Sequence, residues 1–298
     1  MPDKATPDVL CIGHAAFDLC MAVSSHPSAD EKCQAHAMQQ GGGGPSANAA
    51  VTVARLGGKA AWCGYLSNDI YGDAHMAEFT AEGVDTSLAV RGRAPSPLSL
   101  ILAKPDGKRT VVNFKEQTPW LPADALNTAK LKPACMLFDG HEPLLSATLM
   151  WHARKHGIPT VLDAGSLHRG TEELAPQVDY LVASKKFARQ FADTDDMQKA
   201  LAKLAAISPC AVITLGDAGL IWARNGETGN LPAFKVDAID STGAGDAFHG
   251  AFALGVVRNM AWPELLRFAS AAGALTCTKL GARAAIPNLS DVQALLKK

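Results

Sequence analysis

The segment DSTGAGDAFHG, residues 240–250, sets three small residues between two aspartates and then continues into an apolar stretch. Residues 247–257 have the pattern of a helix, so Gly243, Ala244 and Gly245 form the turn at which it begins. The first N–H groups of a helix have no internal partner, and the helix dipole makes that end positive. Because small side chains let a phosphate approach these N–H groups closely, the segment predicts an anion site.

Asp246 follows this turn directly. It would lie beside a phosphoryl group undergoing transfer, where it could accept the proton of the attacking hydroxyl while the N–H groups stabilise charge on the phosphoryl oxygens. An acid in a first turn can also simply cap the helix or stabilise its dipole. Asp240 and Thr242, at the mouth of the turn, could contact a substrate or a cation, or cap the helix.

Two other places carry polar side chains suited to a sugar. Four glycines at 41–44 precede a helical pattern whose first turn holds Asn48, an amide with both donor and acceptor atoms. A flexible loop is the alternative interpretation of these glycines. Asp18 comes after Gly13, at the carboxyl end of the first expected strand, the end at which open α/β sheets bind ligands. Its carboxylate could take two hydrogen bonds from a sugar diol, or form a turn.

These residues are distributed over a chain in which strands alternate with helices. That alternation predicts a parallel sheet covered on both faces by helices. Residues 212–222 form a strand, a Gly-Asp turn and another strand, a pattern typical of a hairpin and sometimes of a nucleotide contact. The expected strands are 8–19, 60–66, 135–140, 160–165, 179–184 and 210–216, and the expected helices are 47–58, 73–83, 144–157 and 196–206.

Two segments, 19–40 and 91–116, interrupt this alternation with short strands and turns. KPDGKR, residues 104–109, is a hairpin signal between two strand-like runs. Strand-rich insertions on an α/β body predict a small β-sheet lid over a cleft, and ordinary surface hairpins are the alternative.

Composition excludes several classes of function. A formal charge of −1 over 298 residues argues against a nucleic-acid binder. No apolar stretch approaches the roughly 20 residues of a membrane span, so no membrane contact is expected. The seven cysteines are scattered without a C-x-x-C pair, which indicates reduced thiols in a cytoplasmic protein.

The two glycine-containing segments, in this order, resemble the two signatures of the PfkB carbohydrate kinases of the ribokinase-like superfamily. GGGGPSANAAVTVARLGGKAAWCGYLSNDIYG, residues 41–72, resembles the first, and DSTGAGDAFHGAF, residues 240–252, the second. The resemblance spans nearly the whole chain. It implies a single ribokinase-like domain over residues 1–298, a three-layer α/β/α fold with the two insertions as its lid. It also implies ATP-dependent phosphorylation of a sugar hydroxyl with Mg²⁺, sometimes with a monovalent cation such as K⁺, and often a homodimer formed through the lid.

Matched position by position, Asp246 takes the place of the family's catalytic base, and residues 243–245 that of its anion hole. The resemblance assigns the remaining positions to ligands. Its sugar-side positions are Asp18, Gly44 and Asn48, with Asp240 beside them, and its nucleotide-side positions are Thr214, Gly216, Gly219 and Thr242.

Three departures from the family pattern concern the ligands. Ser184–Phe187, SKKF, replaces an Asn-x-x-Glu motif near magnesium, so metal handling must differ and no metal ligand is assigned. Ser67 replaces a glycine, and Pro45 stands where ribokinases have lysine, which weakens ribose as the substrate and favours a ketose or related sugar.

The C-terminal stretch LRFASAAGALTCTKLGARAAIP, with Arg283, resembles the sulfofructose kinase branch of the family. A substrate carrying a sulfonate or phosphate would need basic or polar groups under the lid, and Lys32, Asn113 and Lys115 are the candidates. At the strand end FDGHEP, His141 stands where a guanidinium would serve an anion better.

Other classes of function compete with a neutral-sugar kinase. A kinase for an anionic sugar is the first alternative, and a nucleoside kinase or an inactive sugar sensor are the others. A dinucleotide-dependent dehydrogenase is excluded because the first strand leads into GHAAFD and not into a G-x-G-x-x-G turn.

Overall fold

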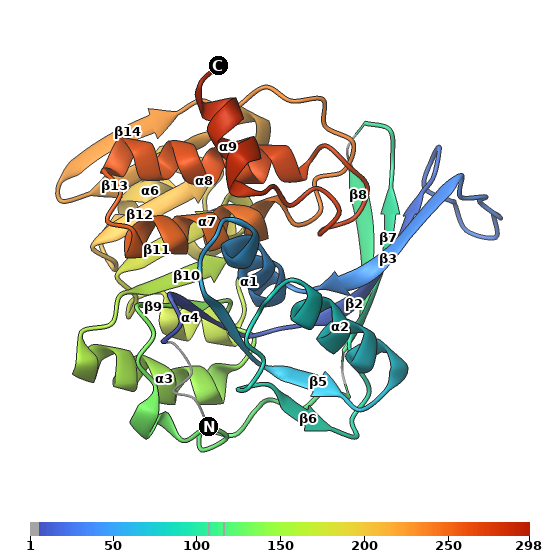
Figure 1. The fold of residues 1–298 in the computed structure, drawn as a ribbon. Coiled ribbons are helices and arrows are strands. Elements are labelled where there is room, and N and C mark those ends of the chain that lie inside the picture. The colour runs from blue at the N-terminus through green and yellow to red at the C-terminus, as the bar shows by residue number, and fades with distance from the viewer. Residues whose placement is uncertain (1–5, 107, 116) are drawn as a thin grey trace.

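The computed structural model describes residues 6–106, 108–115 and 117–298. Its main sheet has the strand order β14-β13-β12-β11-β10-β9-β1-β4 (Figure 1). The strands are β1 (Val9–Ile12), β4 (Ala60–Cys63), β9 (Cys135–Phe138), β10 (Thr160–Ala164), β11 (Tyr180–Ser184), β12 (Cys210–Thr214), β13 (Leu220–Arg224) and β14 (Glu227–Leu231). From β4 to β12 all neighbours are parallel, and β13 and β14 add an antiparallel edge. The expected mostly parallel sheet is confirmed.

Helices cover both faces of this sheet, which makes three layers. The helices are α1 (Pro45–Arg55), α2 (Ile70–Ala81), α3 (Pro143–His156), α4 (Arg169–Leu174), α5 (Lys185–Ala192), α6 (Met197–Ala205), α7 (Ala244–Val257), α8 (Trp262–Thr276) and α9 (Leu289–Leu296), with short 3-10 turns η1 (Thr128–Lys130) and η2 (Gly216–Ala218). Val9 and Cys11 of β1 pack in the core shared with α1, α7 and α8, whereas Leu10 and Ile12 pack in the core shared with α3 to α6. Alternate strand residues thus bury both faces.

A smaller sheet projects from the body (Figure 1). Its strands are β2 (Ala16–Ala22), β3 (Ala37–Gly43), β7 (Leu98–Ala103) and β8 (Arg109–Phe114), in the order β3-β2-β7-β8. They arise from the two interrupting segments predicted from the sequence. The strands β5 (Tyr65–Ser67) and β6 (Val90–Gly92) form a separate two-stranded sheet. Gly107, the expected turn glycine of β7–β8, and Glu116, the end of the second segment, lie outside the described residues.

Glycines divide two of the expected strands. Within 8–19, the turn expected at Gly13 is confirmed: its φ of +143° turns the chain out of β1 and into β2. A Cβ at Gly13 would lie 1.8 Å from Asp139 Oδ1, so the turn needs a glycine. The strand 60–66 likewise divides at Gly64 into β4 and β5.

Candidate active site

The start of α7 has the form that its small residues predicted. Gly243 caps the helix with a φ of +78°, and a Cβ there would lie 2.8 Å from the carbonyl oxygen of Ala282. Gly245 is exposed, and a Cβ on it would meet no atom within 4 Å among the described residues. A ligand can therefore approach the positive end of α7 at Gly245, although the N–H of Ala244 already donates to the carbonyl oxygen of Ser241 over 3.3 Å.

Asp246 lies in the first turn of α7, half-buried, and Asn48 Nδ2 donates to its Oδ2 over 2.7 Å. Asn48 is buried in the first turns of α1, so the two glycine-rich helix starts meet at this contact. Burial raises the pKa of Asp246, and the hydrogen bond from Asn48 opposes that rise. A raised pKa makes a carboxylate a better proton acceptor near neutral pH.

The four glycines form an ordered strand end, so the flexible-loop interpretation is wrong. Gly41–Gly43 belong to β3, and Gly44 caps α1 with a φ of +97°. A Cβ at Gly43 would lie 2.1 Å from Asp18 Oδ2, and one at Gly44 would lie 2.5 Å from the carbonyl oxygen of His14. The glycines therefore let the backbone pass close to Asp18.

Asp18 lies on β2 of the small sheet, 8% exposed. Burial raises its pKa to about 7, and the neighbouring charge of Asp246 adds to that rise, whereas Ser99 and Arg283 oppose it. Asp18, Ser99 and Asn113 form one row across β2, β7 and β8. The structure thus brings Asp18, Gly44, Asn48 and Asp246 into one region.

Asp240 and Thr242 bond to each other. Asp240 is 1% exposed, and its Oδ1 accepts from the N–H and the hydroxyl of Thr242, at 2.9 and 2.6 Å. Its Oδ2 accepts from Gly281 N–H at 2.8 Å. These bonds tie the turn before α7 to the segment after α8. Neither side chain caps α7, whose N-cap is Gly243 without a side-chain hydrogen bond, so the capping alternative is wrong.

The nucleotide-side candidates lie at the end of β12. Thr214 is its last residue, and Gly216 and Gly219 flank the 3-10 turn that leads to β13. Gly216 has open space where a Cβ would be, whereas one on Gly219 would lie 2.0 Å from the carbonyl oxygen of Leu231. Gly216 can therefore be approached by a ligand, and Gly219 serves the tight turn.

The basic and polar side chains proposed for an anionic sugar lie in different surroundings. Lys32 is exposed in the segment joining β2 to β3, and Asn113 is exposed on β8. Lys115, just after β8, reaches the body of the protein, where its Nζ lies 3.2 Å from His141 Nδ1.

Sequence reasoning missed two buried acids at the ends of neighbouring strands. Asp139 follows β9 and accepts N–H bonds from His14, Ser46 and His141 at 2.7, 3.2 and 2.9 Å. Asp163 on β10 lies 3.2 Å from His249 Nδ1, and burial raises its pKa to about 7. An aspartate after an apolar run, as in LFDG and VLDAG, is the signal that could have found both.

The described residues hold no cluster of three or more His, Cys, Asp or Glu side chains arranged to bind a metal ion. Ser184, from the departing SKKF motif, caps α5 by accepting from Phe187 N–H. Mg²⁺ commonly binds through substrate phosphates, waters and one or two carboxylates. The described residues therefore leave Mg²⁺ to be held by the phosphates of ATP and by water at the anion site, and no side chain is assigned to it.

Gly245 offers a test of the anion site. Gly245→Val is expected to fold normally, because its Cβ enters open space, and to lower turnover by about 100-fold or more by covering the N–H groups. Gly243→Ala is the matched control, since its strained φ and its contact with Ala282 should lower the free energy of unfolding by about 1–3 kcal/mol. Thermal unfolding and kcat of both variants separate the roles. Loss of folding in Gly245→Val would contradict the open site.

An oxyanion held at the start of α7 lies next to Asp246. A hydroxyl placed between them has a phosphoryl group to attack and a carboxylate to take its proton. The class of protein that this arrangement suits is a phosphotransferase with an alcohol acceptor.

Comparison with known proteins gives the family. The pfkB family of carbohydrate kinases matches residues 6–289. "Probable fructokinase-4" of Arabidopsis thaliana is 30% identical over 97% of this chain and 96% of its own, and the ribokinase of Haemophilus influenzae is 28% identical over 86% and 87%. A solved structure of a putative ribokinase from Agrobacterium tumefaciens superposes with a TM-score of 0.88 at 28% identity, covering 98% of each chain.

The chain therefore belongs to the PfkB family of carbohydrate kinases, ATP-dependent phosphotransferases that act on sugar hydroxyls and use Mg²⁺. Its fold is the ribokinase-like α/β fold. No helix in the described part of the chain is long and apolar enough to cross a membrane.

Proposed function

We propose that this kinase phosphorylates a hydroxyl of a monosaccharide, a ketose or ketose-like sugar, with Asp246 as general base and the N–H groups of residues 243–245 as the anion hole. The observation that carries the proposal is the open anion site at Gly245 directly before a carboxylate that Asn48 holds at 2.7 Å. Asp246 takes the hydroxyl proton as the oxygen attacks the γ-phosphorus of ATP, the bond between that phosphorus and the bridging oxygen of ADP breaks, and the N–H groups stabilise the charge on the phosphates. Mg²⁺ would supply further positive charge there.

The sugar binds between the small sheet and the body. Asp18 accepts hydrogen bonds from a pair of sugar hydroxyls, and the backbone at Gly44 and the side chain of Asn48 line the same region. ATP lies toward the end of β12, with Thr214 and Gly216 at its side. The four-stranded sheet acts as the lid of a single kinase domain.

A second candidate, a sugar with an anionic substituent, is favoured by one cluster. His14, His141 and His168 follow the neighbouring strands β1, β9 and β10, with ring centroids 5.1 and 4.6 Å apart. Burial lowers the pKa of each, and the charge of Lys115 lowers it further. Neutral imidazoles can donate to an anion, and Lys115 adds the charge.

A sugar panel with ATP and Mg²⁺ tests both candidates through ADP release. The panel holds fructose, ribose, 2-keto-3-deoxygluconate, phosphorylated ketoses, sulfofructose and adenosine. We expect a single ketose or ketose-like sugar to respond most strongly. Lys115→Ala should raise the KM of an anionic responder by about 10-fold or more and leave a neutral one unchanged, because a hydrogen bond to a charged group is worth about 1.5–3 kcal/mol. If adenosine were the best substrate, the protein would be a nucleoside kinase. If no compound caused ADP release although ATP was bound, an inactive sugar sensor would be favoured.

The outer face of the small sheet supports a homodimer. Met38, Leu100, Val112 and Phe114 point to the side opposite Asp18 and are 37–60% exposed. A second copy facing this sheet would bury these side chains, and sedimentation velocity of the purified chain distinguishes dimer from monomer. All seven cysteines are free thiols, which supports a cytoplasmic location.

A further inference from the structure

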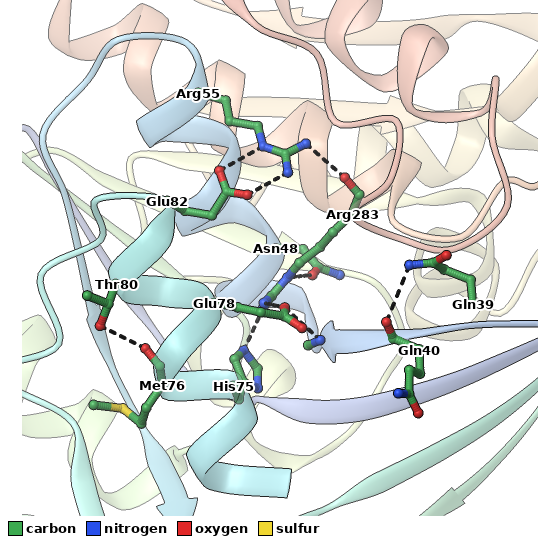
Figure 2. Close-up of polar contacts among 11 residues, drawn as sticks. Gln39, Gln40, Asn48, Arg55, His75, Met76, Glu78, Thr80, Glu82 and Arg283 are labelled. Carbon is green, nitrogen blue, oxygen red and sulfur yellow. Dashed lines mark hydrogen bonds and ion pairs between the residues drawn. The ribbon is translucent and has the colours of Figure 1, made fainter.

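Arg283 is a cation enclosed beside the proposed site. It lies in the segment between α8 and α9, 9% exposed. Its Nη1 donates to Glu78 Oε2 over 2.7 Å, and its Nη2 lies 2.6 Å from His75 Nε2 (Figure 2). Its Nε donates to Asn48 Oδ1 over 2.9 Å. Because these partners occupy all three guanidinium nitrogens, Arg283 is not a free cation awaiting a substrate anion.

The surroundings of Arg283 fix its position. A Cβ on Gly42 would lie 2.1 Å from Arg283 Nη1, so only a glycine leaves room there. The N–H of Gly42 donates to the same Glu78 oxygen, at 2.8 Å, and the ring of Phe79 lies 5.2 Å from Arg283 Cζ. The ion pair, the ring and the adjacent strand thus hold the guanidinium in one orientation.

This orientation decides which way the Asn48 amide points. A guanidinium has only donors, so the Asn48 atom that faces Arg283 must be the oxygen. The amide nitrogen then faces Asp246 Oδ2, 2.7 Å away. In the reversed orientation two donors would face each other at Arg283, and two acceptors would face each other at Asp246.

We propose that Arg283 is a positioning residue for phosphoryl transfer: by holding the oxygen of Asn48 it keeps the Asn48 nitrogen on Asp246, and so holds the base in place. The proposal rests on the proposed function of Asp246. Asn48 carries the effect, since Arg283 makes no hydrogen bond to Asp246 among the described residues. One oxygen of Asp246 is thereby held, which leaves Oδ1 to accept the proton of the sugar hydroxyl.

The charges around Asp246 show what loss of this link would do. Burial raises the pKa of Asp246, the hydrogen bond from Asn48 lowers it, and His249 and Arg109 lower it less. Asp139 raises it, and Asp18 and Asp163 are the other carboxylates whose charges interact with Asp246. An Asn48 amide released from Arg283 would no longer be held as a donor, so the pKa of Asp246 should rise.

The experiment is a carbon NMR titration of the Asp246 carboxyl in the full-length protein, assigned with Asp246→Asn. In Arg283→Met we expect its pKa to rise by about one unit, the size of one hydrogen bond to a charged group. Asn48→Leu should give a similar rise, and the double variant should add nothing further, because both changes remove the same bond. We expect kcat of Arg283→Met to fall by about 10- to 100-fold.

Arg55→Met is the matched control. Arg55 pairs with Glu82 and donates to the backbone oxygens of Arg283 and Ile286, so it secures the same segment without contacting Asn48 (Figure 2). We expect Arg55→Met to lower the thermal stability of the protein and to leave the pKa of Asp246 unchanged. If Arg283→Met does not fold, Arg283→Lys replaces it, because an ammonium lacks the planar fork that joins Glu78 to Asn48.

Two results would overturn the proposal: an unchanged Asp246 pKa in the folded Arg283 variant, or shifts that add in the double variant. The titration of Asp18 is followed in parallel, because the charge of Arg283 acts on that carboxyl directly. The NMR measurement needs no substrate. An enzyme inactive on every sugar would therefore refute the proposed function while the link from Arg283 to Asp246 is still tested.

Discussion

Asp246→Asn is expected to lower kcat by about 10²- to 10⁴-fold, the usual contribution of a general base, while ATP binding persists. The asparagine keeps the size of the side chain and can still contact Asn48, but it cannot take the hydroxyl proton. Removing a negative charge beside the phosphates should leave ATP affinity equal or higher. Turnover on the best sugar of the panel and calorimetry with ATP measure the two effects.

The competing interpretation is that Asp246 only stabilises the dipole of its helix. A residue in the next helix provides the control for this interpretation. Glu264 is an exposed acid in the first turn of α8 and has no place in the site. Glu264→Gln should cost at most about 1 kcal/mol of stability and leave kcat unchanged. An Asp246→Asn enzyme that behaves like Glu264→Gln would show that Asp246 only stabilises its helix.

Local rules were sufficient to predict the start of α7, because small residues before an apolar run specify a helix start wherever it occurs. The strand–helix alternation predicted the main sheet for the same reason. Local rules could not predict that Asn48 would be the hydrogen-bond partner of Asp246. Asn48 lies 198 residues before Asp246 and 235 residues before Arg283. The packing of α1 against α7 brings Asn48 to Asp246.

The strand at Gly41–Gly43 shows most clearly what local sequence rules cannot predict. Glycine favours loops by local propensity, so the sequence permitted a flexible segment. In the structure, Asp18 and Arg283 each lie within 2.1 Å of where a Cβ would be on Gly43 and Gly42. Close approach of two charged side chains, not flexibility, is what these glycines provide.

Asp18→Asn is expected to weaken sugar binding strongly and to stabilise the protein at the same time. An ionised carboxylate accepts two hydrogen bonds from a sugar diol, whereas an amide offers one acceptor and a donor. We expect KM for the sugar to rise by about 100-fold or more, since each hydrogen bond to a charged group is worth about 1.5–3 kcal/mol. Ser99→Ala, on the same row of the small sheet, is the control: it removes a hydrogen bond to Asp18 but keeps the carboxylate, so the KM should rise much less.

The stability gain follows from the pKa of Asp18, which burial raises from 3.8 to about 7. Between these values the native state holds a proton that the unfolded chain has released, so the stability of the wild type falls as pH rises from about 4 to 7. Above pH 7 the native carboxylate is ionised and the full cost is present. Asp18→Asn removes that cost, and we expect it to raise the free energy of unfolding by about 1–3 kcal/mol at pH 8.

That advantage should shrink as the pH is lowered from 8 to 5, because the wild-type carboxyl then becomes neutral in the native state as well. Denaturant unfolding of both proteins at the two pH values measures the difference. A variant less stable than wild type at pH 8 would mean that Ser99 and Arg283 stabilise the ionised Asp18 more than burial destabilises it. In the expected case, the carboxylate is retained at a cost in stability because the sugar requires it.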